Sequence, residues 1–272
     1  MNVIPTFFQA RSGSTLVDLL LDQHDQITTL GEVFYDQRYV DNKDLKKLNK
    51  SNFLRFNEET NQKIRQYKNN KKYFIFQYCY SDMSIFEHSL NYENIFDFIQ
   101  NEFATMIYIR RKNLLKRLVS NQKSNQSKVW HVHANYKLNR HHHAVHLNLK
   151  VDNKYLYQFP FVRKQVNNAT NSESEKVSSL YDFLKIYSLF EKQMFDYAKN
   201  NISNVIDIVY EDHTEKNPLV AVNKITNCLE LKQHNDYNIP LQKIGKSLVD
   251  ELQNYEEVYN HLKDTEFEWM LE

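Results

Sequence analysis

Two polar segments of this sequence carry residues suited to binding phosphate-type anions. The first joins a run of β-branched and aromatic residues to a leucine-rich stretch, and it consists of Arg11, Ser12, Gly13, Ser14 and Thr15. Free N–H groups at a helix start, a glycine that allows close backbone approach and a nearby cation are features with which proteins hold phosphate groups. This segment is therefore a candidate phosphate-binding loop.

The second segment is strongly cationic and also ends an apolar run. It begins with Arg110, Arg111 and Lys112, and a helical pattern containing Lys116, Arg117 and Ser120 follows. Cations at a helix start oppose the helix macrodipole, at a cost of a few tenths of a kcal/mol to ~1 kcal/mol. An anionic ligand would offset that cost.

The first segment differs from the nucleoside-triphosphate loop of kinases and ATPases. It lacks the glycine–lysine pair that grips the β- and γ-phosphates, which makes ATP the less favoured nucleotide. A purely structural alternative stays open, in which Ser14 or Thr15 only caps the helix that follows.

A family resemblance becomes visible when the two segments are taken together. Residues 9–16 (QARSGSTL) resemble the 5′-phosphosulfate-binding loop of sulfotransferases that use 3′-phosphoadenosine 5′-phosphosulfate (PAPS), and residues 110–120 resemble their 3′-phosphate-binding element. The second match is to the bacterial carbohydrate and glycolipid branch in particular. Residues 209–212, with the proline at 218, and residues 254–271 resemble later regions of the family, so the resemblance spans most of the chain.

The resemblance implies roles for individual residues. The 5′-phosphosulfate would be wrapped by Arg11, Ser12, Gly13, Ser14 and Thr15. Arg111 and Ser120 would hold the 3′-phosphate, with Arg110 as the alternative in register. Arg11 stands where the cytosolic branch has lysine; it keeps the charge needed against the leaving phosphate but cannot serve as a proton donor.

Sulfuryl transfer also needs a base that takes the proton of the acceptor hydroxyl. In the tyrosylprotein and bacterial branches, a glutamate after the first helix takes this role. Glu32, in Leu30-Gly31-Glu32, resembles that glutamate in its position. His88, His131 and His133 are rival candidates. A surface glutamate after a glycine turn is the structural alternative.

The resemblance also sets expectations for ligands. PAPS would be the donor and PAP the product, and the acceptor would be a hydroxyl group, with a carbohydrate or glycolipid favoured over a peptide tyrosine. The histidine-rich stretch 131–146 is interpreted as a polar acceptor-facing or surface loop, and no metal is expected. Two other functions stay open: a kinase-like phosphotransferase, and a non-catalytic anion- or glycan-binding protein on the same fold.

Alternating strand and helix patterns would position these residues. Strands are predicted over 3–8, 73–80, 105–109 and 204–210, and helices over 16–21, 113–122, 172–199, from about 218, and 247–262. This order predicts an α/β three-layer sandwich with a mainly parallel central sheet, and the resemblance implies a P-loop-like sulfotransferase fold. We expect a single domain over 1–272 with variable insertions at about 41–70 and 128–170.

Bulk composition excludes several classes of protein. The chain is 41% hydrophobic and 14% aromatic, which suffices for a core, and its net charge of +1 provides no field for nucleic-acid binding. The sequence predicts no signal peptide and no membrane-spanning segment. Cys79 and Cys228 form no CxxC pair; we interpret both as buried thiols and expect a cytoplasmic protein.

Overall fold

The structure, a computed structural model, describes residues 2–32, 58–67, 69–79, 101–127, 144–150, 179–232, 236–241 and 246–272. The chain divides into two compact units, residues 1–110 with 194–238 and residues 111–193 with 239–272. Because much of both expected insertions lies outside the described residues, the expected single domain with those insertions stays a prediction.

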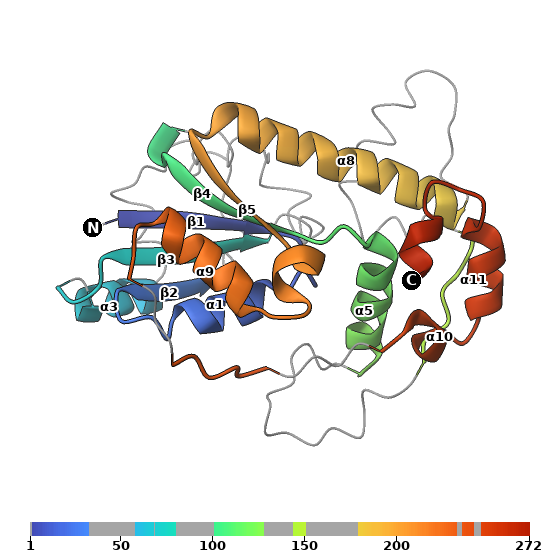
Figure 1. Cartoon of the computed structure of the whole chain (residues 1–272), viewed down its shortest axis with the longest axis horizontal. Coiled ribbons are helices and arrows are strands. Elements are labelled where there is room, and N and C mark those ends of the chain that lie inside the picture. Colours follow the sequence, from blue (N-terminus) through green and yellow to red (C-terminus); the bar gives the residue numbers. More distant parts are fainter. Residues whose placement is uncertain are drawn as a thin grey trace. The chain divides into compact units, whose positions relative to one another are not determined.

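The first unit contains a sheet of five strands in the order β2-β3-β1-β4-β5 (Figure 1). The strands are β1 (Asn2–Phe8), β2 (Ile27–Glu32), β3 (Tyr73–Cys79), β4 (Thr105–Arg110) and β5 (Asn204–Val209). Every neighbouring pair is parallel. The α/β class and the parallel sheet are thereby confirmed, whereas β2 is a strand in addition to the four predicted ones.

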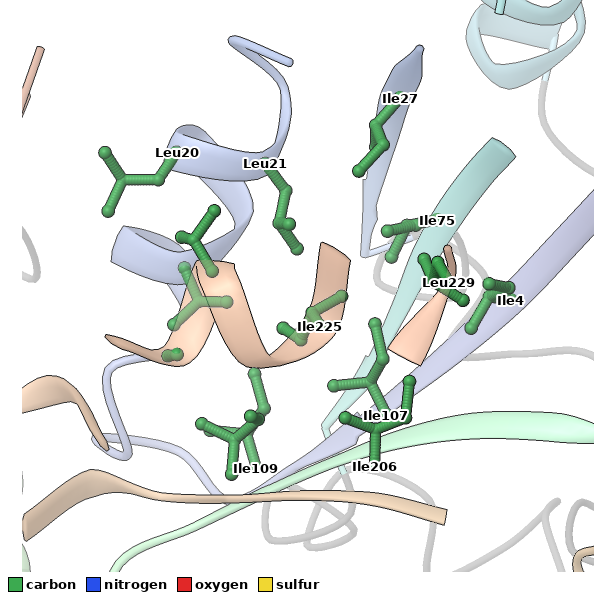
Figure 2. Packing of buried hydrophobic residues seen from close by; sticks show 14 of the residues in the cluster. Ile4, Leu20, Leu21, Ile27, Ile75, Ile107, Ile109, Ile206, Ile225 and Leu229 are labelled. Atoms are coloured by element: carbon green, nitrogen blue, oxygen red, sulfur yellow. The ribbon is translucent and has the colours of Figure 1, made fainter. Parts of the chain in front are cut away.

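One face of the sheet is covered by α1 (Ser14–Leu21) and α9 (Leu219–Cys228). Figure 2 shows Leu20 and Leu21 of α1 and Ile225 of α9 packed with isoleucines of the strands. These side chains are 3% exposed or less, and burial of a side chain of this size contributes roughly 1.5–3 kcal/mol. The helix that starts at the candidate loop is therefore anchored by its own apolar face. The short helix α3 (Glu58–Tyr67) lies near β2.

The opposite face is aromatic and packs on the end of α8 (Leu180–Asn201) that belongs to the first unit. Phe7 stacks on Tyr78 at 5.1 Å between ring centroids, and Tyr108 meets Phe195 of α8 edge to face at 5.2 Å. Alternate residues of β1 thus face different helical layers, as the period-two geometry of a strand requires. Helices on both faces confirm the three-layer arrangement.

The second unit contains α5 (Leu114–Ser127), the first part of α8, α10 (Leu248–Glu251), α11 (Tyr255–Leu262) and the 3₁₀ turn η4 (Glu268–Leu271). Helix α5 confirms the helix predicted from 113 and runs five residues beyond the predicted end. Helix α8 begins at Leu180, and residues 172–178 of its predicted range lie outside the described residues.

The prediction of one continuous helix over 247–262 is wrong. Leu252 is extended (φ −110°, ψ 124°) and forms a parallel bridge with Val145. The amide of Asn254 then accepts a hydrogen bond from the Leu147 N–H and donates one to the Leu147 carbonyl. Pairing with this neighbouring segment breaks the helix in two.

Burial of both cysteines was also expected, and only Cys79 is buried. Cys228 is the last residue of α9 and is exposed, because the next residue, Leu229, takes the buried place in the apolar cluster.

Candidate functional site

The candidate phosphate-binding loop lies at the carboxyl end of β1, the middle strand of the sheet. The chain leaves β1 for the β2–β3 side of the sheet, whereas β4 lies on its other side, and the Gln9 N–H donates to the Ile109 carbonyl of β4 at 3.2 Å. Such a topological switch point is where ligands bind in open α/β sheets. The first polar segment of the sequence therefore lies at the position in the sheet where a ligand is expected.

The loop is a tight turn held by Ser12. Both the N–H and the Oγ of Ser12 donate to the Gln9 carbonyl, at 3.2 and 2.6 Å, and Ser12 is fully buried. The residues on either side of it have left-handed backbone, with φ of 65° at Arg11 and 81° at Gly13. A left-handed conformation costs a non-glycine residue roughly 1–2 kcal/mol, and such strain gathers at functional sites.

Helix α1 starts in this loop without a side-chain cap. Gly13 is its N-cap residue, and the first intrahelical bond runs from the Val17 N–H to the Gly13 carbonyl at 3.1 Å. Ser14 and Thr15 are thus helix residues, so the alternative in which one of them caps the helix does not hold. The N–H groups of the first helical turn have no carbonyl of their own helix to bond, and the first turn contains no acidic residue. This end of α1 therefore favours an anion.

Gly13 is also required for space. A Cβ at this position would lie 2.9 Å from Cδ2 of Tyr210 and 3.2 Å from Cγ2 of Thr214. Both belong to η3 (Tyr210–Thr214), a π-helical turn that follows β5. Tyr210, in the segment 209–212, and Thr214 thus form a wall of the loop, a contact that no local sequence pattern predicts.

Glu32 is turned toward the α1 face of the sheet by a bulge in β2. Thr29 pairs with Ile75 and Glu32 with Gln77, so three residues of β2 advance against two of β3. Because side chains alternate between faces, this extra residue places Glu32 on the same face as Thr29. Gly31, at φ 67°, supplies the left-handed residue within the bulge. The side chain of Gln77, the partner of Glu32 on β3, in turn donates to the Ser14 carbonyl at 3.3 Å and thereby joins β3 to the start of α1.

A second carboxyl group near Glu32 was not predicted from the sequence. Asp18, on α1, accepts a hydrogen bond from the Thr29 hydroxyl, and its Oδ1 is buried without a hydrogen-bond partner among the described residues. Burial raises the pKa of Asp18 from its ordinary value of 3.8 to about 7. The carboxylates of Asp22 and Glu32 act in the same direction. The available signal was a lone acid in the otherwise apolar stretch LVDLLL.

Arg110 lies on the other face of the sheet. Its guanidinium forms two hydrogen bonds to the Asp207 carboxylate, both 2.9 Å long, and stacks on the Phe195 ring at 4.2 Å. These contacts hold the Arg110 charge against β5 and α8. The sequence signal for this ion pair was an aspartate, Asp207, in the middle of the otherwise apolar strand NVIDIV.

Arg111 and Ser120 belong to the second unit, whereas the loop and Glu32 belong to the first. Ser120 lies on α5, whose start is capped by the Asn113 side chain: its Oδ1 accepts from the Lys116 N–H at 2.9 Å. Arg117, predicted as part of the cationic segment, is buried beside Glu191 at 3.4 Å and over the Tyr187 ring at 4.8 Å. The assignment of the 3′-phosphate to this segment stays a prediction.

Three rival bases, His88, His131 and His133, lie outside the described residues, as does most of the histidine-rich stretch. Among the histidines of that stretch, His146 is described, and its side chain is exposed. No helix in the described ranges is both long and apolar enough to cross a membrane.

Comparison with known proteins gives a structural match but no match by sequence. Neither a protein-family model nor a curated protein matches the sequence. A solved structure does match. It is a sulfotransferase from Alicyclobacillus acidocaldarius, 12% identical, with 94% of this chain and 90% of that chain covered and a TM-score of 0.46. At this identity and TM-score, the likeness does not assign an activity to the chain.

Proposed function

We propose that this protein is a sulfotransferase that moves the sulfuryl group of PAPS to a hydroxyl group of an acceptor, a carbohydrate or glycolipid. The observation that carries the proposal is the loop at the end of the middle strand. It combines an uncapped helix start, a strained arginine and a glycine with no room for a side chain, and its sequence resembles the 5′-phosphosulfate loop of the family.

The loop supplies what the leaving group needs. As the bond between sulfur and the bridging phosphate oxygen breaks, negative charge grows on the 5′-phosphate of PAP. The positive end of α1 and the guanidinium of Arg11 would stabilise that charge. Because arginine holds its proton at all relevant pH values, PAP would leave as the anion.

Glu32 is the proposed base. Its carboxylate would take the proton of the acceptor hydroxyl while the oxygen forms its bond to sulfur, opposite the leaving phosphate. The bulge at Gly31 supports this role, because it turns Glu32 to the face of the sheet on which α1 begins.

The proposal favours Arg111, with Ser120, over Arg110 for the 3′-phosphate. Arg110 already has a bidentate carboxylate partner and a stacked ring. A phosphate would have to compete with Asp207 for it.

Titration calorimetry of PAP tests the donor site. We expect PAP to bind the wild-type protein in the micromolar range and ATP to bind much more weakly. Arg11→Ala should weaken PAP binding by about 10- to 100-fold, because it removes one or two charge-assisted hydrogen bonds. Lys216→Ala, which removes an exposed cation of the same unit, is the matched control and should bind PAP as wild type does. ATP binding without PAP binding would favour the kinase-like alternative instead.

Turnover tests the base. With PAPS and a panel of sugar acceptors, Glu32→Gln should lower kcat by about 10²–10⁴-fold, the usual contribution of general base catalysis. Its affinity for PAP should stay within about twofold of wild type, since the substitution removes charge but keeps shape. PAP binding with no turnover of any hydroxyl acceptor by the wild-type protein would favour the non-catalytic binder.

A further inference from the structure

Asp18 occupies a place that joins the two chemical parts of the first unit. It lies on α1, four residues after Ser14, which is about 6 Å of helix rise from the start of the helix. Its carboxyl also accepts the hydrogen bond of the Thr29 hydroxyl on β2. One side chain thus connects the helix that begins at the loop with the strand that ends at Glu32.

Thr29 is held at a second point by the same segment of chain. Its backbone N–H donates to Oδ1 of Asp22, in the turn after α1, at 2.8 Å. Thr29 is also the last residue of β2 in regular register before the bulge. Asp18 and Asp22 together fix the point from which the bulge directs Glu32.

The surroundings of Asp18 disfavour its charged form. Its Oδ1 is buried and has no partner among the described residues, and a carboxylate oxygen in that situation is poorly solvated. Two further carboxylates, Asp22 and Glu32, act on it, and the opposing groups are the Thr29 hydroxyl and the ammonium of Lys63 on α3. Burial is the largest of these effects and brings the pKa of Asp18 to about 7.

We propose that Asp18 is a positioning residue that couples the loop to Glu32, and that it takes up a proton from solvent when an anionic nucleotide occupies the loop. The inference rests on the proposed function. A phosphate at the start of α1 adds negative charge near Asp18 and thereby favours its neutral form. Binding of the nucleotide then removes a charge that would repel a negatively charged donor and the Glu32 carboxylate.

Proton-linked calorimetry of PAP binding tests this coupling. The titration is repeated at pH 7.5 in buffers of different ionisation enthalpy, which gives the number of protons taken up on binding. The phosphates of PAP add their own contribution to every variant, so the informative quantity is the difference between variants. We expect wild type to take up about half a proton more than Asp18→Asn, for a pKa raised by about one unit on binding.

Asp25→Asn is the matched control. It removes the same charge from the same unit, at a side chain that is 80% exposed, and its proton uptake should equal that of wild type. If Asp18→Asn binds PAP and takes up as many protons as wild type, the inference is wrong while the proposed donor site stands. If PAP does not bind wild type at all, the proposed function is what fails.

A measurement without ligand tests the premise separately. Because Asp18 is uncharged or poorly solvated in the folded protein, Asp18→Asn should fold and should be more stable than wild type above pH 7. Urea midpoints measured from pH 5 to pH 8 should fall for wild type relative to Asp18→Asn. Parallel curves would show that Asp18 titrates as an ordinary carboxyl group, and the inference would be withdrawn.

Discussion

A methyl group added at Gly13 should damage this protein far more than the same group added at Gly31. Both glycines have left-handed backbone, with φ of 81° and 67°. An L-residue in that conformation costs roughly 1–2 kcal/mol, and about 0.4–1 kcal/mol returns because alanine restricts the unfolded chain. Since a Cβ on Gly31 would meet nothing within 4 Å, Gly31→Ala should cost only about 0.5–1 kcal/mol.

Gly13→Ala adds a steric cost to the same backbone cost. Its Cβ would lie 2.9 Å from Cδ2 and 3.1 Å from Cε2 of Tyr210, and 3.2 Å from Cγ2 of Thr214. Thr214 is buried and has little room to move, and overpacking of this kind costs about 1–3 kcal/mol. The total is about 2–4 kcal/mol, and η3 or the loop must shift by several tenths of an ångström.

Urea unfolding followed by far-ultraviolet circular dichroism measures both variants, and PAP titration reports on the loop. Gly13→Ala should lose stability and PAP affinity together, whereas Gly31→Ala should keep its PAP affinity. In a double-mutant cycle, Tyr210→Ala should relieve at least about 1 kcal/mol of the cost of Gly13→Ala. Equal costs for the two glycine variants, or no relief from Tyr210→Ala, would refute the packing of η3 against the loop.

Three further predictions concern individual contacts. Arg110→Ala and Asp207→Ala should show a coupling free energy of about 1 kcal/mol in a double-mutant cycle of urea unfolding, because the pair is bidentate and about a quarter exposed; additive effects would contradict the contact. Asn113→Ala should lower the free energy of unfolding by about 2 kcal/mol in thermal or urea unfolding, since it removes the cap of α5 and a buried hydrogen bond to the Met270 carbonyl. Asn113→Asp should keep the cap hydrogen bond and lose only the bond to Met270. The pKa of Asp18 is raised in the folded state, so the folded protein keeps a proton that the unfolded chain releases, and stability falls as pH rises from about 4 to about 7; the loss is up to about 4 kcal/mol and should be absent in Asp18→Asn.

Four of the five strands were predictable because each is a run of β-branched and aromatic residues. β1, β3, β4 and β5 agree with their predicted ranges to within one residue at each end. β2 was missed because its sequence, ITTLGE, contains a glycine and ends on an acid. Its pairing with β3 depends on a partner more than 40 residues away, and a local pattern does not contain that information.

The position of the loop in the sequence was predictable, but the contacts that constrain its residues were not. A strand, a glycine and a helix pattern located the anion-binding turn, since such turns obey local rules. The wall formed by Tyr210 and Thr214 follows β5, about 200 residues later. The pairing of Arg110 with Asp207 likewise joins positions 97 residues apart, so no spacing rule would have separated Arg110 from Arg111.

Glu32 shows why a candidate base cannot be assigned from its position in the sequence alone. In a regular strand, residues 29, 31 and 33 would share one face, and Glu32 would lie on the aromatic face with Arg110. The extra residue at Gly31 reverses that parity and brings the carboxylate to the face on which α1 begins. Regular pairing of the unchanged sequence would turn Glu32 to the opposite face, whereas deletion of one residue between Thr29 and Glu32 would remove the bulge and leave Glu32 opposite Gln77, on the α1 face. The bulge, rather than the glutamate itself, therefore decides on which face of the sheet the proposed base lies.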